Sequence, residues 1–118
     1  MIAPRRKRMA VEVESFKSVD LVTVKGRIDS ESAPALDEAL KQLTENGRYK
    51  LVLDMAGVEY LSSAGVRALV SALRTCKGRF GDVRIATPST RVAEVLELAG
   101  LTSLFESYDD VTAAVGSF

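Results

Sequence analysis

The chain has no histidine, no tryptophan and only one cysteine among its 118 residues. Histidine is the usual general base of hydrolytic enzymes, so its absence excludes Ser-His-Asp and Cys-His catalytic arrangements. A single thiol without histidine cannot build a thiolate zinc site, and Cys76 has no second cysteine with which to form an internal disulfide. These absences predict a protein that is not an enzyme, has no catalytic residues and holds neither a metal nor a cofactor.

The chain also lacks long apolar runs. No stretch approaches the roughly 20 apolar residues that a membrane-spanning helix needs, so we expect no membrane span. The basic residues near the start are not followed by the apolar region of a secretory signal. Together with the lone cysteine, these features predict a cytoplasmic protein.

Charge is balanced in total but unevenly distributed. The 16 basic and 16 acidic residues cancel, yet four of the basic ones (Arg5, Arg6, Lys7 and Arg8) lie in the first ten positions. The rest of the chain is therefore acidic, which disfavours nucleic acid as a direct ligand because phosphate binding needs clustered Lys and Arg. We predict a disordered basic tail over residues 1–8 and one domain over residues 9–118.

The first part of that domain is predicted to be a β-hairpin. Apolar and polar residues alternate over residues 9–14, which is strand spacing, and a second β-rich run covers residues 21–25. Residues 17–20 between the two runs have turn composition, and Gly26 is predicted to end the second strand.

The rest of the domain alternates between helical and strand patterns. Helices are predicted after residues 30–34 as far as Asn46-Gly47, from residue 62 to 73, from 89 to 99 and from 109 or 110 onward; strands are predicted at 51–55, 83–86 and 104–107. Strands that alternate with helices pair in parallel through right-handed crossovers. The predicted fold class is therefore α/β, with a mixed sheet of four or five strands flanked by about four helices.

The segment most able to carry a function is Ser62-Ser63-Ala64-Gly65, which is predicted to follow a buried strand and a turn and to begin a helix. Ser62 is placed to be the N-cap and to accept a hydrogen bond from the amide of Ala64 or Gly65. Ser63 then falls in the first turn and is expected to face solvent. A helix start has unpaired N–H groups and a partial positive charge, so it tolerates a phosphate. Ser63 is thus a candidate phosphorylation site, with simple helix capping by both serines as the alternative.

Several motifs together resemble the STAS domain. They are Gly-Arg-Ile-Asp at residues 26–29, Ala-Pro-Ala-Leu at 33–36, Leu-Asp at 53–54 and Tyr-Leu-Ser-Ser-Ala-Gly-Val-Arg-Ala-Leu at 60–69. More closely, the chain is similar to free-standing anti-sigma-factor antagonists of bacteria, from about Met9 to its C-terminus. The resemblance implies a sheet of four or five strands flanked by helices.

It also implies a partner-switching function. In that family the unphosphorylated antagonist binds an anti-sigma factor that is also a serine/threonine kinase, which frees the sigma factor. The kinase phosphorylates a serine at a helix start and the complex dissociates; a PP2C-type phosphatase restores binding. Ser63 matches the phosphoacceptor. The commonest family pattern at this point is Asp-Ser-Ser-Gly, so Ser62 replaces an acidic residue and is an alternative acceptor.

The predicted partner-binding residues surround this helix start: Asp29, Ser30, Ser62, Ser63, Ala64, Gly65 and Arg67. Asp29 matches an acidic family position, and its alternative role is that of a turn or helix-cap residue. Two other functions remain open. One is a nucleotide- or anion-binding module that uses the same helix start, with Arg67 as the nearest basic residue. The other is a STAS scaffold in a larger signalling or lipid-transport complex, without phosphorylation.

Overall fold

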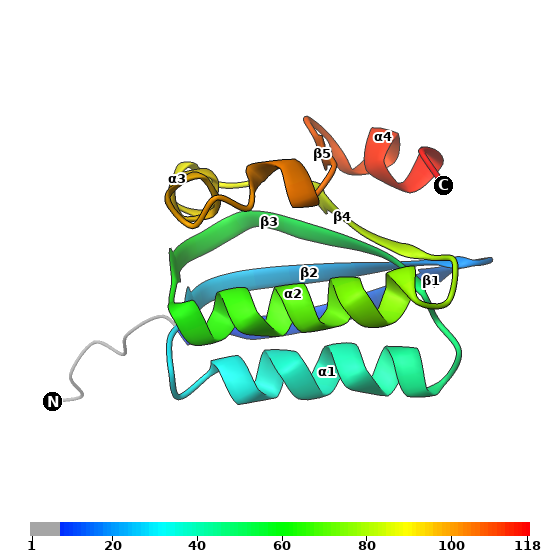
Figure 1. Cartoon of the computed structure of the whole chain (residues 1–118), viewed down its shortest axis with the longest axis horizontal. Helices are drawn as coiled ribbons and strands as arrows, with labels where there is room; N and C mark the ends of the chain where they lie inside the picture. Colours follow the sequence, from blue (N-terminus) through cyan, green and yellow to red (C-terminus); the bar gives the residue numbers. More distant parts are fainter. Residues whose placement is uncertain (1–7) are drawn as a thin grey trace, which may run out of the picture.

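The computed structural model describes residues 8–118. Its elements, shown in Figure 1, are β1 Ala10–Phe16, β2 Val19–Ile28, α1 Ala33–Glu45, β3 Lys50–Leu61, α2 Ser63–Lys77, β4 Asp82–Ala86, α3 Thr90–Leu98, the 3₁₀ turn η1 Thr102–Leu104, β5 Ser107–Tyr108 and α4 Val111–Gly116. Apart from Arg8, the predicted basic tail lies outside the described residues, and the domain division near residue 9 stays a prediction.

The five strands form one mixed sheet in the order β1-β2-β3-β4-β5. The first two strands are antiparallel and the others are parallel, joined by α1, α2 and α3. This arrangement confirms the predicted α/β class, because antiparallel strands can be joined by a tight turn whereas parallel strands need crossover helices. Within residues 8–118, no helix is long and apolar enough to cross a membrane.

The core lies on both faces of the sheet. Along β3, Leu51, Leu53 and Met55 belong to the larger apolar cluster, whereas Val52 belongs to a smaller one that includes Ala114 of α4. Residues of α1, α2 and α3 cover the larger cluster, and Figure 1 shows α1 and α2 side by side against the sheet. The continuous apolar run at residues 51–55 therefore marks a strand that is buried on both faces, as predicted.

The first three strands are longer than predicted. β1 runs to Phe16 and β2 starts at Val19, so the predicted turn of residues 17–20 shortens to two residues. Gly26 does not end β2: it has a φ of +90°, and a Cβ there would lie 2.3 Å from the carbonyl oxygen of Arg8. The register of β2 against β3 shifts between Gly26 and Arg27, so the glycine forms an irregularity inside the strand. Likewise β3 continues to Leu61, which pairs with Ile28, and no turn separates this strand from Ser62.

The strand predicted at residues 104–107 is also different. Residues 102–104 form the 3₁₀ turn, Phe105 is buried in the larger cluster, and β5 comprises only Ser107 and Tyr108. A short apolar pair between polar residues fits a strand, but here Leu104 is exposed and the buried ring of Phe105 alone anchors an irregular segment to the core.

Candidate functional site

The start of α2 is held by the ends of β2 and β3. The backbone N–H of Ser62 donates to the carbonyl oxygen of Ile28 at 2.8 Å, and Ser62 has the extended conformation of an N-cap. Its hydroxyl oxygen accepts a hydrogen bond from the amide of Gly65 at 3.2 Å, which confirms the predicted cap. Because the Ser62 hydroxyl is engaged in capping and Ser62 is half-buried, it is less accessible from solvent than Ser63.

Gly65 allows α2 to approach the sheet closely. The residue is buried, and a Cβ at this position would lie 2.6 Å from Cγ2 of Ile28 and 2.7 Å from Cδ1 of Leu61. Any side chain would push the helix start outward. A direct contact between Gly65 and a partner stays a prediction, but its packing fixes where Ser63 lies.

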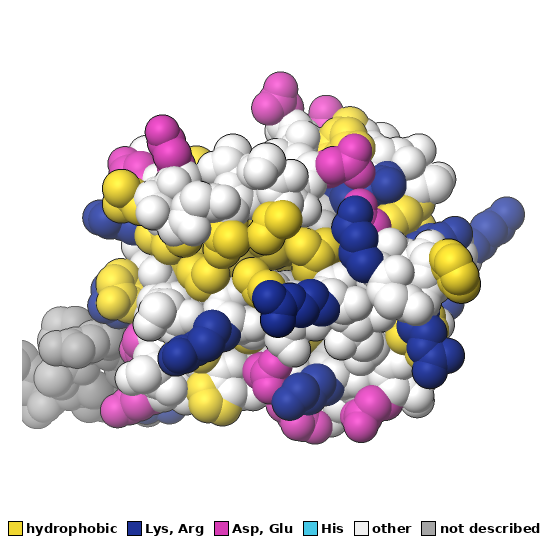
Figure 2. Space-filling view, in the orientation of Figure 1, with side chains coloured by type: hydrophobic (Ala, Val, Ile, Leu, Met, Phe, Trp, Pro, Cys, Tyr) yellow, Lys and Arg dark blue, Asp and Glu magenta, His cyan; other side chains and the backbone are white. Residues whose placement is uncertain are grey.

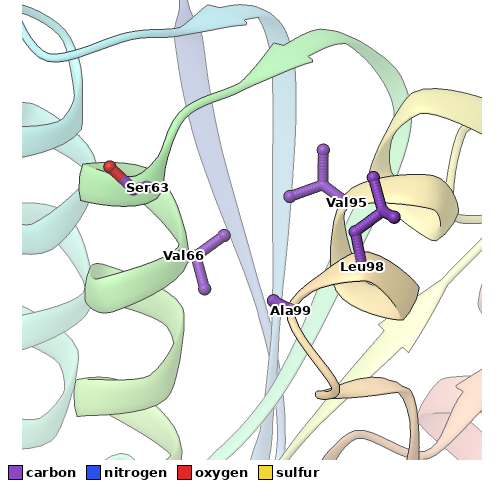
Figure 3. Close-up of a pocket in the computed structure, with 5 residues that line it drawn as sticks. All are labelled: Ser63, Val66, Val95, Leu98 and Ala99. Atoms are coloured by element: carbon purple, nitrogen blue, oxygen red, sulfur yellow. The ribbon is translucent and has the colours of Figure 1, made fainter.

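Ser63 is the first residue of α2 and is exposed, as predicted. Figure 3 shows its hydroxyl oxygen directed away from the side chains of α3. Among residues 8–118, the backbone N–H groups of Ser63 and Ala64 have no acceptor. A phosphate on Ser63 would therefore project outward, near two free donors and the positive end of the helix dipole.

An apolar groove of about 320 Å³ adjoins Ser63. Val66 forms one side, and Val95 and Leu98 of α3 form the other together with Ala99, the C-cap of that helix (Figure 3). Figure 2 shows hydrophobic side chains gathered between α2 and α3, and Leu98 is 89% exposed. An exposed leucine beside an open apolar groove is typical of a surface that binds another protein.

Asp29 lies beside this helix start, because it follows Ile28, whose carbonyl oxygen accepts from Ser62. Its carboxylate accepts hydrogen bonds from the backbone N–H groups of Ser32, at 2.9 Å, and Glu31, at 3.0 Å. The bond from the backbone of Ser32 is the main reason why the pKa of Asp29 is below its usual value. The carboxylate thus stabilises the turn before α1, and its contact with a partner stays a prediction.

The remaining predicted partner-binding residues lie at or near the surface. Ser30 and Arg67 are exposed, and Ala64 is half-buried. Arg67 lies one helical turn after Ser63, and no residue within the described part of the chain forms an ion pair with it. The spacing brings a guanidinium within reach of a phosphate on Ser63.

Arg27 and Tyr60 lie near the same end of the sheet, where they are paired across β2 and β3. The guanidinium carbon of Arg27 lies 4.5 Å from the centre of the Tyr60 ring, and this ring is half-exposed. Its exposure comes from the extension of β3, which periodicity did not indicate.

The remaining candidates for site chemistry are acidic clusters and the single thiol, Cys76. Residues 8–118 contain no cluster of three or more histidine, cysteine, aspartate or glutamate side chains that could hold a metal. Cys76 is buried near the end of α2, and burial raises the pKa of its thiol to about 11. It is a residue of the larger apolar cluster.

Comparison with known proteins shows the family of the chain. The family model described as the STAS domain matches residues 10–114, so the chain belongs to the STAS-domain family. Curated relatives include the anti-sigma-F factor antagonist RsfB of Mycobacterium tuberculosis, which is 27% identical and covers 91% of this chain and 89% of its own.

Solved structures of anti-sigma factor antagonists have a similar fold. An anti-sigma factor antagonist from Mycobacterium paratuberculosis has a TM-score of 0.84 at 26% identity and covers 93% of each chain. The Bacillus cell fate determinant SpoIIAA in its phosphorylated form has a TM-score of 0.75, with 92% of this chain and 98% of that chain covered. At 14% identity, the second likeness shows the fold alone.

Proposed function

We propose that this protein is an anti-sigma-factor antagonist that works by partner switching, with Ser63 as the switch. In its unphosphorylated form it binds an anti-sigma factor that has serine kinase activity, and so releases the sigma factor. Phosphorylation of Ser63 dissociates the complex, and a PP2C-type phosphatase restores binding by removing the phosphate. The observation that carries the proposal is an exposed hydroxyl at a helix start, on the rim of an apolar groove.

The groove supports the binding state. Val66, Val95 and Ala99 offer an uncharged surface next to Ser63, and the exposed Leu98 extends it. A partner that covers these side chains removes apolar area from water and also desolvates the Ser63 hydroxyl. The proposed interface adds Asp29, Ser30, Ser62, Ala64, Gly65 and Arg67, the residues around the same helix start.

The same geometry supports the released state. A phosphate on Ser63 adds a charge of about −1.5 to −2 at the rim of the groove. The free N–H groups of Ser63 and Ala64, together with Arg67, stabilise that charge while it stays in water. Once a partner covers it, the charge loses its hydration, so binding weakens while the domain remains folded.

The test is to measure binding of the cognate purified anti-sigma factor to the wild type and to Ser63→Ala and Ser63→Glu variants by calorimetry. Ser63→Ala should bind within about twofold of the wild type and take up no phosphate from ATP. Ser63→Glu should weaken binding by about 30-fold or more, because the carboxylate is desolvated in the complex. Intact mass and peptide mapping report whether the phosphate is on Ser63 or on Ser62.

Thr90→Glu is the matched control. Thr90 is also an exposed hydroxyl residue at the first position of a helix, but it does not line the groove. This variant should bind as the wild type does. If Ser63→Glu binds as tightly as the wild type, the switch is wrong, and the alternative of a STAS scaffold without phosphorylation replaces it.

A further inference from the structure

The far end of α2 carries a second surface feature, the turn of residues 77–81 that leads to β4. This turn is firmly held. The backbone N–H groups of Gly81 and Arg79 both donate to the carbonyl oxygen of Cys76, at 2.8 and 3.0 Å. Gly81 lies so close to Tyr49 that a Cβ would be 1.8 Å from the Tyr49 carbonyl oxygen. The side chain that projects from the turn is therefore presented from a fixed backbone.

That side chain is Phe80, which is 99% exposed. Its φ of +64° lies in the left-handed region, where glycine is strongly preferred. Gly78 and Gly81 stand close by, yet neither occupies the left-handed position. A left-handed backbone disfavours the folded state, and a ring that stays exposed gains nothing from folding, so folding stability does not explain this residue.

The surroundings of Phe80 are basic. Arg48, Lys50 and Arg79 line, with Phe80, a depression of about 170 Å³. Figure 2 shows Lys and Arg side chains gathered at the end of the molecule where this turn lies, opposite the start of α2 (Figure 1).

The two buried acidic side chains at this end are already matched within the fold. Asp20 is fully buried and accepts hydrogen bonds from the Ser15 hydroxyl and from Nε of Arg48, the latter at 2.5 Å. Asp82 is buried and pairs with Arg84 at 3.1 Å. Among residues 8–118, neither Lys50 nor Arg79 has an ion-pair partner. The residues that line the depression include no acidic side chain, so its charge is positive.

We infer that Phe80 and the basic depression beside it form a second protein-docking surface, which takes an acidic segment of a partner protein. Phe80 inserts into an apolar pocket of the partner, while Arg79 and Lys50 pair with its carboxylates. A central aromatic residue with charged residues around it is the usual anatomy of an interaction hot spot.

The observations favour a protein over other polyanions. One ring is too little apolar surface for a membrane anchor, which needs a broad apolar face. The domain outside its first ten residues is acidic overall, which disfavours a long phosphate backbone. The 15 residues of α2 separate this surface from Ser63 by about 22 Å, so both surfaces can be occupied at once.

The test uses a phage-displayed library of random peptides, selected on the full-length wild type and counter-selected on Phe80→Gly. Glycine suits the left-handed position, so this variant should unfold at a temperature about 4 °C higher. Enriched peptides should combine acidic with apolar residues. As synthetic peptides, they should bind Phe80→Gly about tenfold more weakly than the wild type, and Arg79→Glu more weakly still.

Phe80→Tyr, which keeps the ring, should bind these peptides as the wild type does, and so should Ser63→Glu. The result for Ser63→Glu separates this surface from the proposed switch. If that variant still binds the anti-sigma factor tightly, the switch is wrong, but peptide binding at Phe80 is unchanged. The inference is overturned if no acidic peptide is enriched. It is overturned equally if oligothymidine, or vesicles of equal parts phosphatidylcholine and phosphatidylserine, bind through Phe80 while peptides do not.

Discussion

Helices α2 and α3 begin in the same way. Each has a serine N-cap, Ser62 or Ser89, whose hydroxyl accepts a hydrogen bond of 3.2 Å from the amide three residues later. Each continues with an exposed hydroxyl residue at its first position, Ser63 or Thr90. Local capping chemistry therefore does not distinguish the two helix starts.

The two helix starts differ in the residues that follow the first position. The third residue of α2 is the tightly packed Gly65, which brings Ser63 to the edge of the groove, whereas the third residue of α3 is a buried valine. Four residues after Ser63 stands Arg67, but four residues after Thr90 stands Glu94. The helix dipole favours a negative charge at both helix starts, but Arg67 adds to this effect at the first and Glu94 reduces it at the second. The contrast shows that neighbours, rather than the cap, make a helix start suitable for phosphate.

The largest expected effect tests the close packing of α2. Gly65→Ala places a Cβ against Ile28, whose β-branched side chain has little freedom to move, and should lower the free energy of unfolding by about 2 kcal/mol. Urea unfolding measures it. Gly78→Ala is the control: it has ordinary contacts and a helical backbone, so it should be neutral or slightly stabilising. Equal losses in both variants would remove the packing argument.

A smaller effect tests whether the two caps are equivalent. Ser62→Ala and Ser89→Ala each remove the acceptor of one amide and should each destabilise the protein by about 1 kcal/mol. Thermal and urea unfolding of the two variants should agree within a few tenths of a kcal/mol. If Ser62→Ala has almost no effect, then the backbone hydrogen bond from Ser62 to Ile28 holds the start of α2, and the caps are not equivalent.

Local spacing was enough to predict the cap at Ser62 and the exposure of Ser63, because both depend on hydrogen bonds within four residues. It was also enough for the order of strands and helices. The groove could not be predicted, since it joins two helices that are far apart in the sequence. Val95 in particular fits the core periodicity of α3, and only the structure shows that it is half-buried at the groove.

Two glycines show what their spacing alone does not reveal. Gly26 was predicted to end a strand, but it serves a close approach to the backbone of Arg8. Gly81 follows the end of α2, where the Tyr49 carbonyl oxygen leaves no room for a side chain, while Phe80 occupies the left-handed position. A glycine signals an unusual backbone or a crowded neighbour, and the sequence alone does not say which.

The smallest expected effect measures the charge preference of the two helix starts in the free protein. Ser63→Glu should raise the free energy of unfolding by about 0.5–1 kcal/mol, through the helix dipole and Arg67. Thr90→Glu should gain less than about half as much, because Glu94 repels the new carboxylate. Urea unfolding in dilute buffer measures both, and the difference should shrink in about 1 M salt, where the screening length falls to about 3 Å. An equal gain at both positions would mean that Arg67 contributes nothing, and that a phosphate on Ser63 relies on the helix start alone.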